Sequence, residues 1–238
     1  MVVKSSLDQL KRLHVSDSVL YDFVTAQVGG AHVKDAKTGA YLLGNANTLK
    51  ILGLKRFEQF IGRNVFEIDE FMRPYWGGEY AKNIGEVDAK AVLECKVSVK
   101  KDIILLNAAH QIYVHDLLKV PLIGVDNKPV ALLTTVVDRT KDIDLFYLLE
   151  LYRKLASNKN QGLRDFIRFL GIADFFHEEL TYKEVVCLLH MRLNPAYKRA
   201  ARKLSVTVKT IESHASHIIG KLKDRRLAII LAHLRETL

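Results

Sequence analysis

Residues 205–222 read SVTVKTIESHASHIIGKL and predict one capped amphipathic helix. Thr207 stands where a side-chain oxygen accepts a hydrogen bond from a backbone N–H of the first turn. After it, apolar residues recur at helical spacing, namely Val208, Ile211, Ala215, Ile218, Ile219 and Leu222. Most of the other positions are polar, so we expect a helix that buries one stripe and presents its remaining faces to solvent.

The residues before this helix predict two more helices. Thr181 and Glu184 have the spacing of a capping box, which marks the start of a helix whose buried face follows from Val185. The dipeptide at 194–195, Asn-Pro, ends that helix, because proline disfavours helical conformation in the residue before it. A second helix is expected over 198–204, where alanines at 200 and 201 allow close packing, and a fourth over 226–234.

Charge is unevenly divided along the chain. The 238 residues have a formal net charge of +9, yet residues 180–238 hold 12 Lys/Arg and 4 Asp/Glu, a net charge of +8. The first 179 residues are therefore almost balanced. A neutral domain followed by a basic helical domain is the electrostatic pattern of a nucleic-acid binder.

The C-terminal segment resembles the LuxR/FixJ-type helix-turn-helix regulators. The matching residues are Leu180-Thr181, Glu184, Leu188, Ala201, Leu204, Val206, Lys209-Thr210-Ile211, His214, Ile218 and Lys221-Leu222. The chain departs from the pattern at 194–195, where a glycine is usual, and at Glu212 and Ser216, where basic residues are common in some relatives. These departures bear on which operator is recognised and not on the fold.

The resemblance implies a division of roles among the polar residues. Glu212, Ser213 and Ser216 take positions that face bases, and an acidic Glu212 could accept a hydrogen bond from cytosine N4. Other residues would lie nearer phosphates. The predicted DNA-binding set is Lys198, Thr207, Lys209, Thr210, Glu212, Ser213, Ser216, His217 and Lys221.

The N-terminal half predicts an α+β domain. Two short strands flank a turn at 37–39, a helix follows over 48–54, and further helices are expected between 57 and 93. Three strands are then predicted over 91–99, 112–121 and 130–137, the last two joined by a turn-rich hairpin connection. The expected fold is an antiparallel sheet with helices, followed by an all-α helix-turn-helix domain.

This order of elements is similar to that of PAS sensor domains. The residues that carry the resemblance are Val33-Lys34-Asp35, Tyr41-Leu42-Leu43-Gly44-Asn45, Leu52-Gly53, Ile61-Gly62-Arg63, Pro121-Leu122 and Val136-Val137-Asp138-Arg139-Thr140. We therefore expect a helical segment at 1–25, a PAS-like sensor or dimerisation domain at 26–141, a helical connector at 142–177 and the DNA-binding domain at 178–238. The apolar stripe of the connector is either intramolecular core or a surface for a second subunit.

No cofactor is identifiable from the sequence. The reactive cysteine of flavin-type PAS domains is missing, and His110 and His115 fall on or beside strands, where an axial haem ligand is not expected. Cys95 and Cys187 stand far apart and are expected to be small buried apolar residues, not a metal site. Two interpretations of the PAS-like domain stay open: it binds a small-molecule ligand, or it serves only for dimerisation.

Three other functions compete with a PAS-containing regulator. Trp76 and Tyr80 have the W-x-x-x-Y spacing that acyl-homoserine lactone receptors use, although core packing explains this match better. A protein-interaction module that has lost DNA binding is the second, and an enzyme is the third. An enzyme is disfavoured because no nucleophile motif or Gly-rich phosphate loop is present.

The remaining expectations concern the cellular location of the protein and its binding partners. No apolar run approaches the roughly 20 residues of a membrane span, and the N-terminus has no signal-peptide block. We expect a cytoplasmic bacterial homodimer that binds double-stranded DNA, with RNA polymerase as a further candidate partner and no membrane association.

Overall fold

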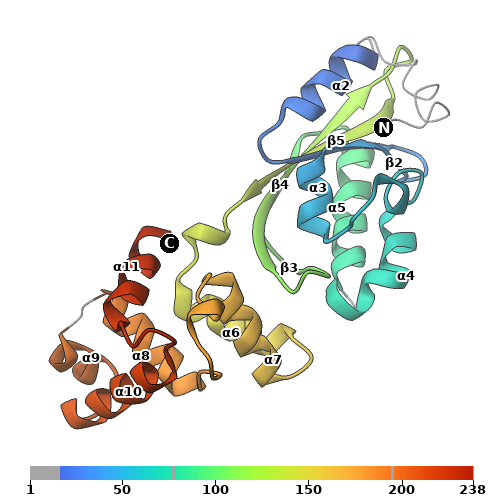
Figure 1. Cartoon of the computed structure of the whole chain (residues 1–238). Coiled ribbons are helices and arrows are strands. Elements are labelled where there is room, and N and C mark those ends of the chain that lie inside the picture. The colour runs from blue at the N-terminus through green and yellow to red at the C-terminus, as the bar shows by residue number, and fades with distance from the viewer. Residues whose placement is uncertain (1–16, 77–78, 194–195, 238) are drawn as a thin grey trace. The chain divides into compact units, whose positions relative to one another are not determined.

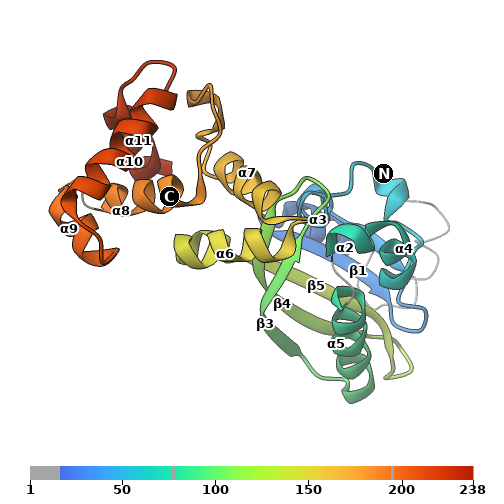
Figure 2. The same cartoon turned by 90° about the horizontal axis from the view of Figure 1, so that it is seen from below.

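The computed structural model describes residues 17–76, 79–193 and 196–237. The chain divides into two compact units, Met1–Asp142 (unit 1) and Ile143–Leu238 (unit 2). Each unit is described by itself (Figures 1 and 2). In the described parts of both units, no helix is long and apolar enough to cross a membrane.

Unit 1 is built on a five-stranded antiparallel sheet with the strand order β2-β1-β5-β4-β3. Its strands are β1 (Gly30–Asp35), β2 (Tyr41–Gly44), β3 (Ser98–Leu106), β4 (Ile112–Ile123) and β5 (Pro129–Asp138). The hairpin of β1 and β2 joins the other three strands because β1 pairs with β5. The pairing runs from Gly30 opposite Val136 to Asp35 opposite Ala131. This is the PAS-like antiparallel sheet that the sequence predicts, and with its helices it confirms the α+β class.

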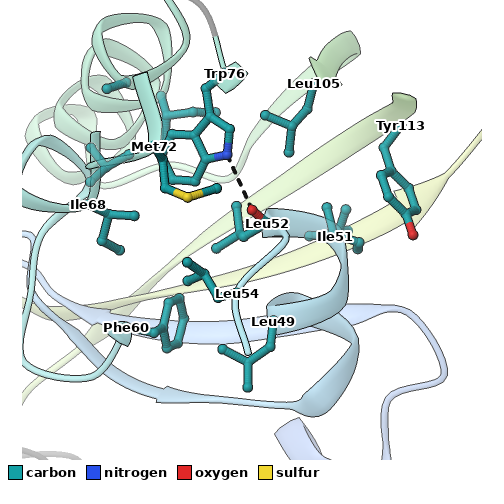
Figure 3. Packing of buried hydrophobic residues seen from close by; sticks show 14 of the residues in the cluster. Leu49, Ile51, Leu52, Leu54, Phe60, Ile68, Met72, Trp76, Leu105 and Tyr113 are labelled. Atoms are coloured by element: carbon teal, nitrogen blue, oxygen red, sulfur yellow. Dashed lines mark hydrogen bonds between the residues drawn. The ribbon is translucent and has the colours of Figure 1, made fainter. Parts of the chain in front are cut away.

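Helices cover both faces of this sheet. The larger core lies under α3 (Ala46–Leu52), the 3-10 turn η1 (Phe57–Gln59), α4 (Val65–Trp76) and α5 (Tyr80–Glu94). Figure 3 shows part of it, with the indole N–H of Trp76 donating to the Leu52 carbonyl at 3.3 Å. The opposite face packs against α2 (Asp17–Ala26) through Leu20 and Val24. The 3-10 turn η2 (Thr140–Asp142) ends the unit.

The start of the strand predicted over 91–99 is wrong. Residues 91–94, placed in a strand by the sequence, form the last turn of α5, and β3 starts only at Ser98. The α5 helix ends at Cys95 in the left-handed conformation (φ 53°), where the cysteine is exposed and not buried as predicted. Valines at 92, 97 and 99 have high strand propensity, but Ala91 and Ile84 supply the apolar spacing that packs α5 on the sheet.

The regular elements of unit 2 among its described residues are all helices. Its helices are α6 (Leu145–Leu155), α7 (Lys159–Phe169), the 3-10 turn η3 (Ala173–Phe175), α8 (Tyr182–Leu193), α9 (Tyr197–Lys203), α10 (Val208–Lys221) and α11 (Leu227–Thr237). A short antiparallel bridge pairs Phe176 with Leu222, so the segment before α8 is hydrogen-bonded to the end of α10. The predicted helix break at 194–195 lies outside the described residues.

The predicted connector forms an antiparallel helical hairpin. The second helix of the hairpin starts at Lys159, where Asn158 caps α7 and its side chain accepts from the Gln161 N–H. Most of the apolar stripe faces inward, with Tyr152 and Phe166 fully buried and their rings 5.8 Å apart. In this chain the stripe therefore serves mainly as intramolecular core.

A close backbone approach in this hairpin gives a stability prediction. A Cβ added at Gly162 would lie 2.3 Å from the carbonyl oxygen of Tyr152, and no side-chain rotation relieves a clash with backbone. We expect Gly162→Ala to lower the free energy of unfolding of unit 2 by about 1–3 kcal/mol, measured by urea unfolding of the full chain. Gly220→Ala is the matched control, since nothing lies within 4 Å of its added Cβ.

The control variant should behave in the opposite way. Removing a helical glycine with free space around it is expected to stabilise α10 by about 0.5–1 kcal/mol. Equal effects of the two substitutions would show that the α6–α7 contact does not limit the stability of unit 2.

Candidate functional site

The start of α8 forms the predicted capping box. The Thr181 N–H donates to Glu184 Oε2 at 2.7 Å, and the Glu184 N–H donates to Thr181 Oγ1 at 3.3 Å. The same carboxylate accepts from the ammonium of Lys221 at 2.7 Å. Burial would raise the pKa of the Glu184 carboxyl, but the hydrogen bonds from Lys221 and Thr181 outweigh it and hold that pKa below its usual value.

The sequence predicts Lys221 near phosphates, whereas in the structure its ammonium contacts groups of unit 2 itself. Its ammonium donates to the Glu179 carbonyl as well as to Glu184, and its side chain is only 17% exposed. The ion pair fastens the C-terminal end of α10 to the N-terminal end of α8. The charge of Lys221 is thus already matched inside the unit, because a buried carboxylate stands directly beside it.

The turn between α9 and α10 is tightly defined. The Val206 N–H bonds to the Ala201 carbonyl and the Ser205 N–H to the Arg202 carbonyl, which together form a Schellman motif. Ser205 takes the left-handed position of this motif (φ 53°). Thr207 then caps α10, its hydroxyl accepting from the Thr210 N–H at 3.1 Å, as the sequence predicts.

The outer face of α10 carries most of the predicted DNA-binding residues. Lys209, Glu212, Ser213, Ser216 and His217 are all exposed there, opposite a stripe in which Ile211, Ala215 and Ile218 are buried. These five residues lie together on one face because their spacing follows the turn of the helix.

Two residues at the start of α10 take different surroundings. Thr210 is half-buried, with its hydroxyl 2.9 Å from that of Thr207. Val208, predicted in the buried stripe, is instead 38% exposed, because it precedes the first turn that packs against α8. The start of α10 is thus a capped helix end with an apolar side chain left in solvent.

A group of basic residues on α9 was missing from the predicted set. Arg199, Arg202 and Lys203 are exposed on the same short helix as the predicted Lys198. The turn between α10 and α11 adds exposed Lys223 and Arg225. The motif YKRAARK at 197–203 was the available signal, since the two alanines are buried and every charged residue remains outside.

Unit 1 holds a second polar constellation inside its core. Lys34 of β1 and Lys119 of β4 both contact Asp88 of α5, with Nζ to Oδ distances of 2.5 and 2.6 Å. Both lysine side chains are almost fully buried, at 2% and 1% exposure. Burial lowers the pKa of Lys119 to about 8, although Asp88 acts against that shift. We call these three residues the core charge cluster.

Two histidines border the core charge cluster. Both ring nitrogens of His32 are buried without a hydrogen-bond partner among the described residues, as is Nδ1 of His115. Burial lowers the pKa of His115 to about 4, and burial, Lys119 and Lys34 hold the pKa of His32 well below its usual value. Both imidazoles are therefore neutral at pH 7.

Other predicted motifs have structural roles. Trp76 is buried and hydrogen-bonded to Leu52, and its ring centroid lies 5.0 Å from that of Tyr80. The W-x-x-x-Y match is therefore part of the core. Cys187 is buried, which raises the pKa of its thiol to about 11. Within the described ranges, no three His, Cys, Asp or Glu residues are grouped so that they could hold a metal ion.

Comparison with known proteins gives structural likenesses at low sequence identity. No family model and no curated protein matches the chain. VqmA of Vibrio cholerae in complex with a ligand and DNA is 19% identical over 94% of this chain and 88% of that one, with a TM-score of 0.45. The PAS domain of Bordetella pertussis BvgS is 16% identical over 62% of this chain and 98% of that domain, with a TM-score of 0.45.

A further likeness is to the VqmA dimer in the absence of target DNA, a LuxR-type receptor. It is 17% identical and covers 92% of this chain and 88% of that one, with a TM-score of 0.43. Because these TM-scores lie below 0.5, we assign the fold of unit 1 from its own strand order and helix placement.

Proposed function

We propose that this chain is a sequence-specific DNA-binding regulator of transcription. Unit 2 binds double-stranded DNA as a LuxR/FixJ-type helix-turn-helix, and unit 1 senses a small molecule or mediates dimerisation. The observation that carries the proposal is the exposed polar face of α10 beside the basic surface of α9. A capped helix with short polar side chains fits the major groove, while flanking lysines and arginines meet phosphates.

The LuxR/FixJ resemblance implies the roles of these exposed residues. Glu212, Ser213 and Ser216 face bases, with His217 at the edge of the same surface, and Lys209 meets the phosphate backbone. Thr207 and Thr210 hold the capped end of α10, whose free N–H groups favour a phosphate. Lys198 contributes together with the other exposed basic residues of α9. Lys221 instead positions α10 through Glu184.

The protein would act as a homodimer in the bacterial cytoplasm and read two half-sites about one helical turn apart. No step of this proposal requires a membrane or catalysis by the chain, and contact with RNA polymerase would follow binding at a promoter. VqmA, whose structure holds a ligand and DNA, is a protein of the kind proposed here.

Salt dependence tests the proposed interface. Removing one phosphate contact should reduce the slope of log affinity against log salt by about 0.9. We expect Lys209→Ala to weaken binding to all duplexes and to reduce the slope by about that amount, measured by fluorescence anisotropy of the full chain. Lys221→Met should leave the slope unchanged, because its ammonium is occupied by Glu184.

Lys100→Ala, an exposed lysine on β3, removes the same charge elsewhere and should change neither affinity nor slope. An unchanged slope for Lys209→Ala would remove that residue from the interface. Absence of any DNA affinity at low salt would instead favour an interaction module. Genomic footprinting of the intact protein would then supply the operator.

A further inference from the structure

The core charge cluster contains more positive than negative charge. One carboxylate, Asp88, faces two buried ammonium groups, those of Lys34 and Lys119. The neighbouring His32 adds no charge because it is held neutral. Lys34 also lies over the ring of Tyr41, 4.3 Å from its centroid, which is a partial compensation at most. The cluster therefore keeps a charge of +1 inside the fold, where an unmatched charge is costly.

A surface groove opens onto this cluster. It has a volume of about 500 Å³, and its polar lining consists of Lys34 and Asp88 together with Asp35, Lys37, Thr38 and Asn64. The other walls are mainly apolar, with Val65 and Phe66 from α4 and Val92 from α5. Gly85 brings α5 close to α4, since a Cβ there would lie 2.7 Å from the Phe66 ring. The groove thus combines an apolar body with a polar end at which Lys34 of the core charge cluster lies.

On its inner side the cluster borders a small closed cavity. Lys119, His32, Tyr41 and Tyr80 are among its lining residues. Its volume of about 20 Å³ holds roughly one water molecule. His32, whose ring nitrogens have no hydrogen-bond partner among the described residues, lines this cavity. A ligand larger than a water molecule does not fit here, whereas the outer groove has room for one.

We propose that the outer groove binds an amphipathic monocarboxylate, whose carboxylate pairs with Lys34 and whose apolar tail lies along Phe66 and Val92. The inference rests on the proposed sensory role of unit 1 and names the chemical class of its ligand. One added negative charge brings the cluster to neutrality while Asp88 keeps its contact with Lys119. A charged hydrogen bond at a buried lysine, together with an apolar wall, selects an acid over its amide.

Calorimetric titration of the full chain tests this site with three probes at constant ionic strength. Hexanoate carries both charge and tail, hexanamide carries the tail alone, and acetate carries the charge alone. We expect hexanoate to bind at least tenfold more tightly than either of the others. Equal binding of hexanoate and hexanamide, or no heat with hexanoate at about 10 mM, would overturn the proposal.

Variants locate the site. Lys34→Met should weaken hexanoate binding at least tenfold, whereas Lys100→Met, an exposed lysine on β3 outside the groove, should leave it unchanged. Phe66→Ala should weaken hexanoate and spare acetate, because it removes only the apolar wall. If Lys34→Met does not fold, Phe66→Ala alone keeps the test decisive, since hexanoate binding that this exposed side chain does not affect would contradict the site.

The outcome is separable from that of DNA binding. Lys209→Ala lies in unit 2 and should bind hexanoate like the unchanged protein. Retained hexanoate binding by a chain without DNA affinity would uphold this site and refute the regulator, while the converse result would refute the site alone.

Discussion

Asp88→Ala is expected to lower the free energy of unfolding of unit 1 by about 3–5 kcal/mol, because it leaves two buried lysines without a counter-charge. Both ammonium groups contact this carboxylate and have almost no access to solvent. Lys119 would respond by losing its proton, since burial already depresses its pKa. Urea unfolding monitored by hydrogen exchange at β1 and β4 measures the effect and assigns it to unit 1.

A triple variant provides the matched control. Lys34→Met, Lys119→Met and Asp88→Leu together replace the whole core charge cluster with apolar side chains of similar size. Buried ion clusters replaced in this way are often neutral or more stable. We therefore expect the triple variant to be at least as stable as the unchanged chain. A triple variant as unstable as Asp88→Ala would mean that packing, and not unmatched charge, causes the loss.

The second large effect is acid destabilisation of unit 1. The pKa of His115 is about 4 in the folded protein against 6.5 as its ordinary value, so the unfolded chain binds a proton that the folded chain refuses. Stability from this group is complete above pH 6.5 and is lost as pH falls toward 4. The shift corresponds to about 3 kcal/mol. His32 acts in the same direction, since its pKa is lowered as well.

Other charges near His115 do not reverse this sign. Burial outweighs the opposing effect of Asp138 and Asp116, while Lys119 adds to the lowering of the pKa. Asp88 contributes in a separate window, because its depressed pKa stabilises the fold above pH 3.8 and that contribution is lost below. Urea unfolding between pH 4 and 7 should show a slope that His115→Gln reduces. A pH-independent stability over this range would contradict the assignment.

The local signals in the sequence were sufficient for much of the fold. The turn at 37–39 and the hairpin connection before β5 are rich in turn formers, and strand-like runs flank them, so the sequence predicts both hairpins. The boundary at α5 and β3 was missed because valines favour strand locally, whereas packing of Ile84 and Ala91 on the sheet decides for helix. The strand propensity of individual residues gives no information on this tertiary contact between α5 and the sheet.

The two candidate sites also differ in how far the sequence alone predicts them. The exposed face of α10 follows from helical periodicity, whereas the ion pair of Lys221 with Glu184 does not, because the two residues lie 37 positions apart. The core charge cluster was not predicted either. Lys34 and Asp88 are 54 residues apart and belong to different elements. A lysine among apolar strand residues carries no sign of its partner, so such sites emerge only once the sheet and α5 are assembled.

The bridge between Phe176 and Leu222 limits how the proposed DNA-binding face of α10 can move. Backbone hydrogen bonds on both sides of it, from His177 to Lys221 and from Lys223 to Phe175, join the end of α10 to the segment that follows α7. The ion pair of Arg164 with Glu179 adds a tie from α7 to the same segment. Moving the end of α10 away from residues 175–177 would break these backbone bonds. The proposed DNA-binding face therefore moves together with this segment.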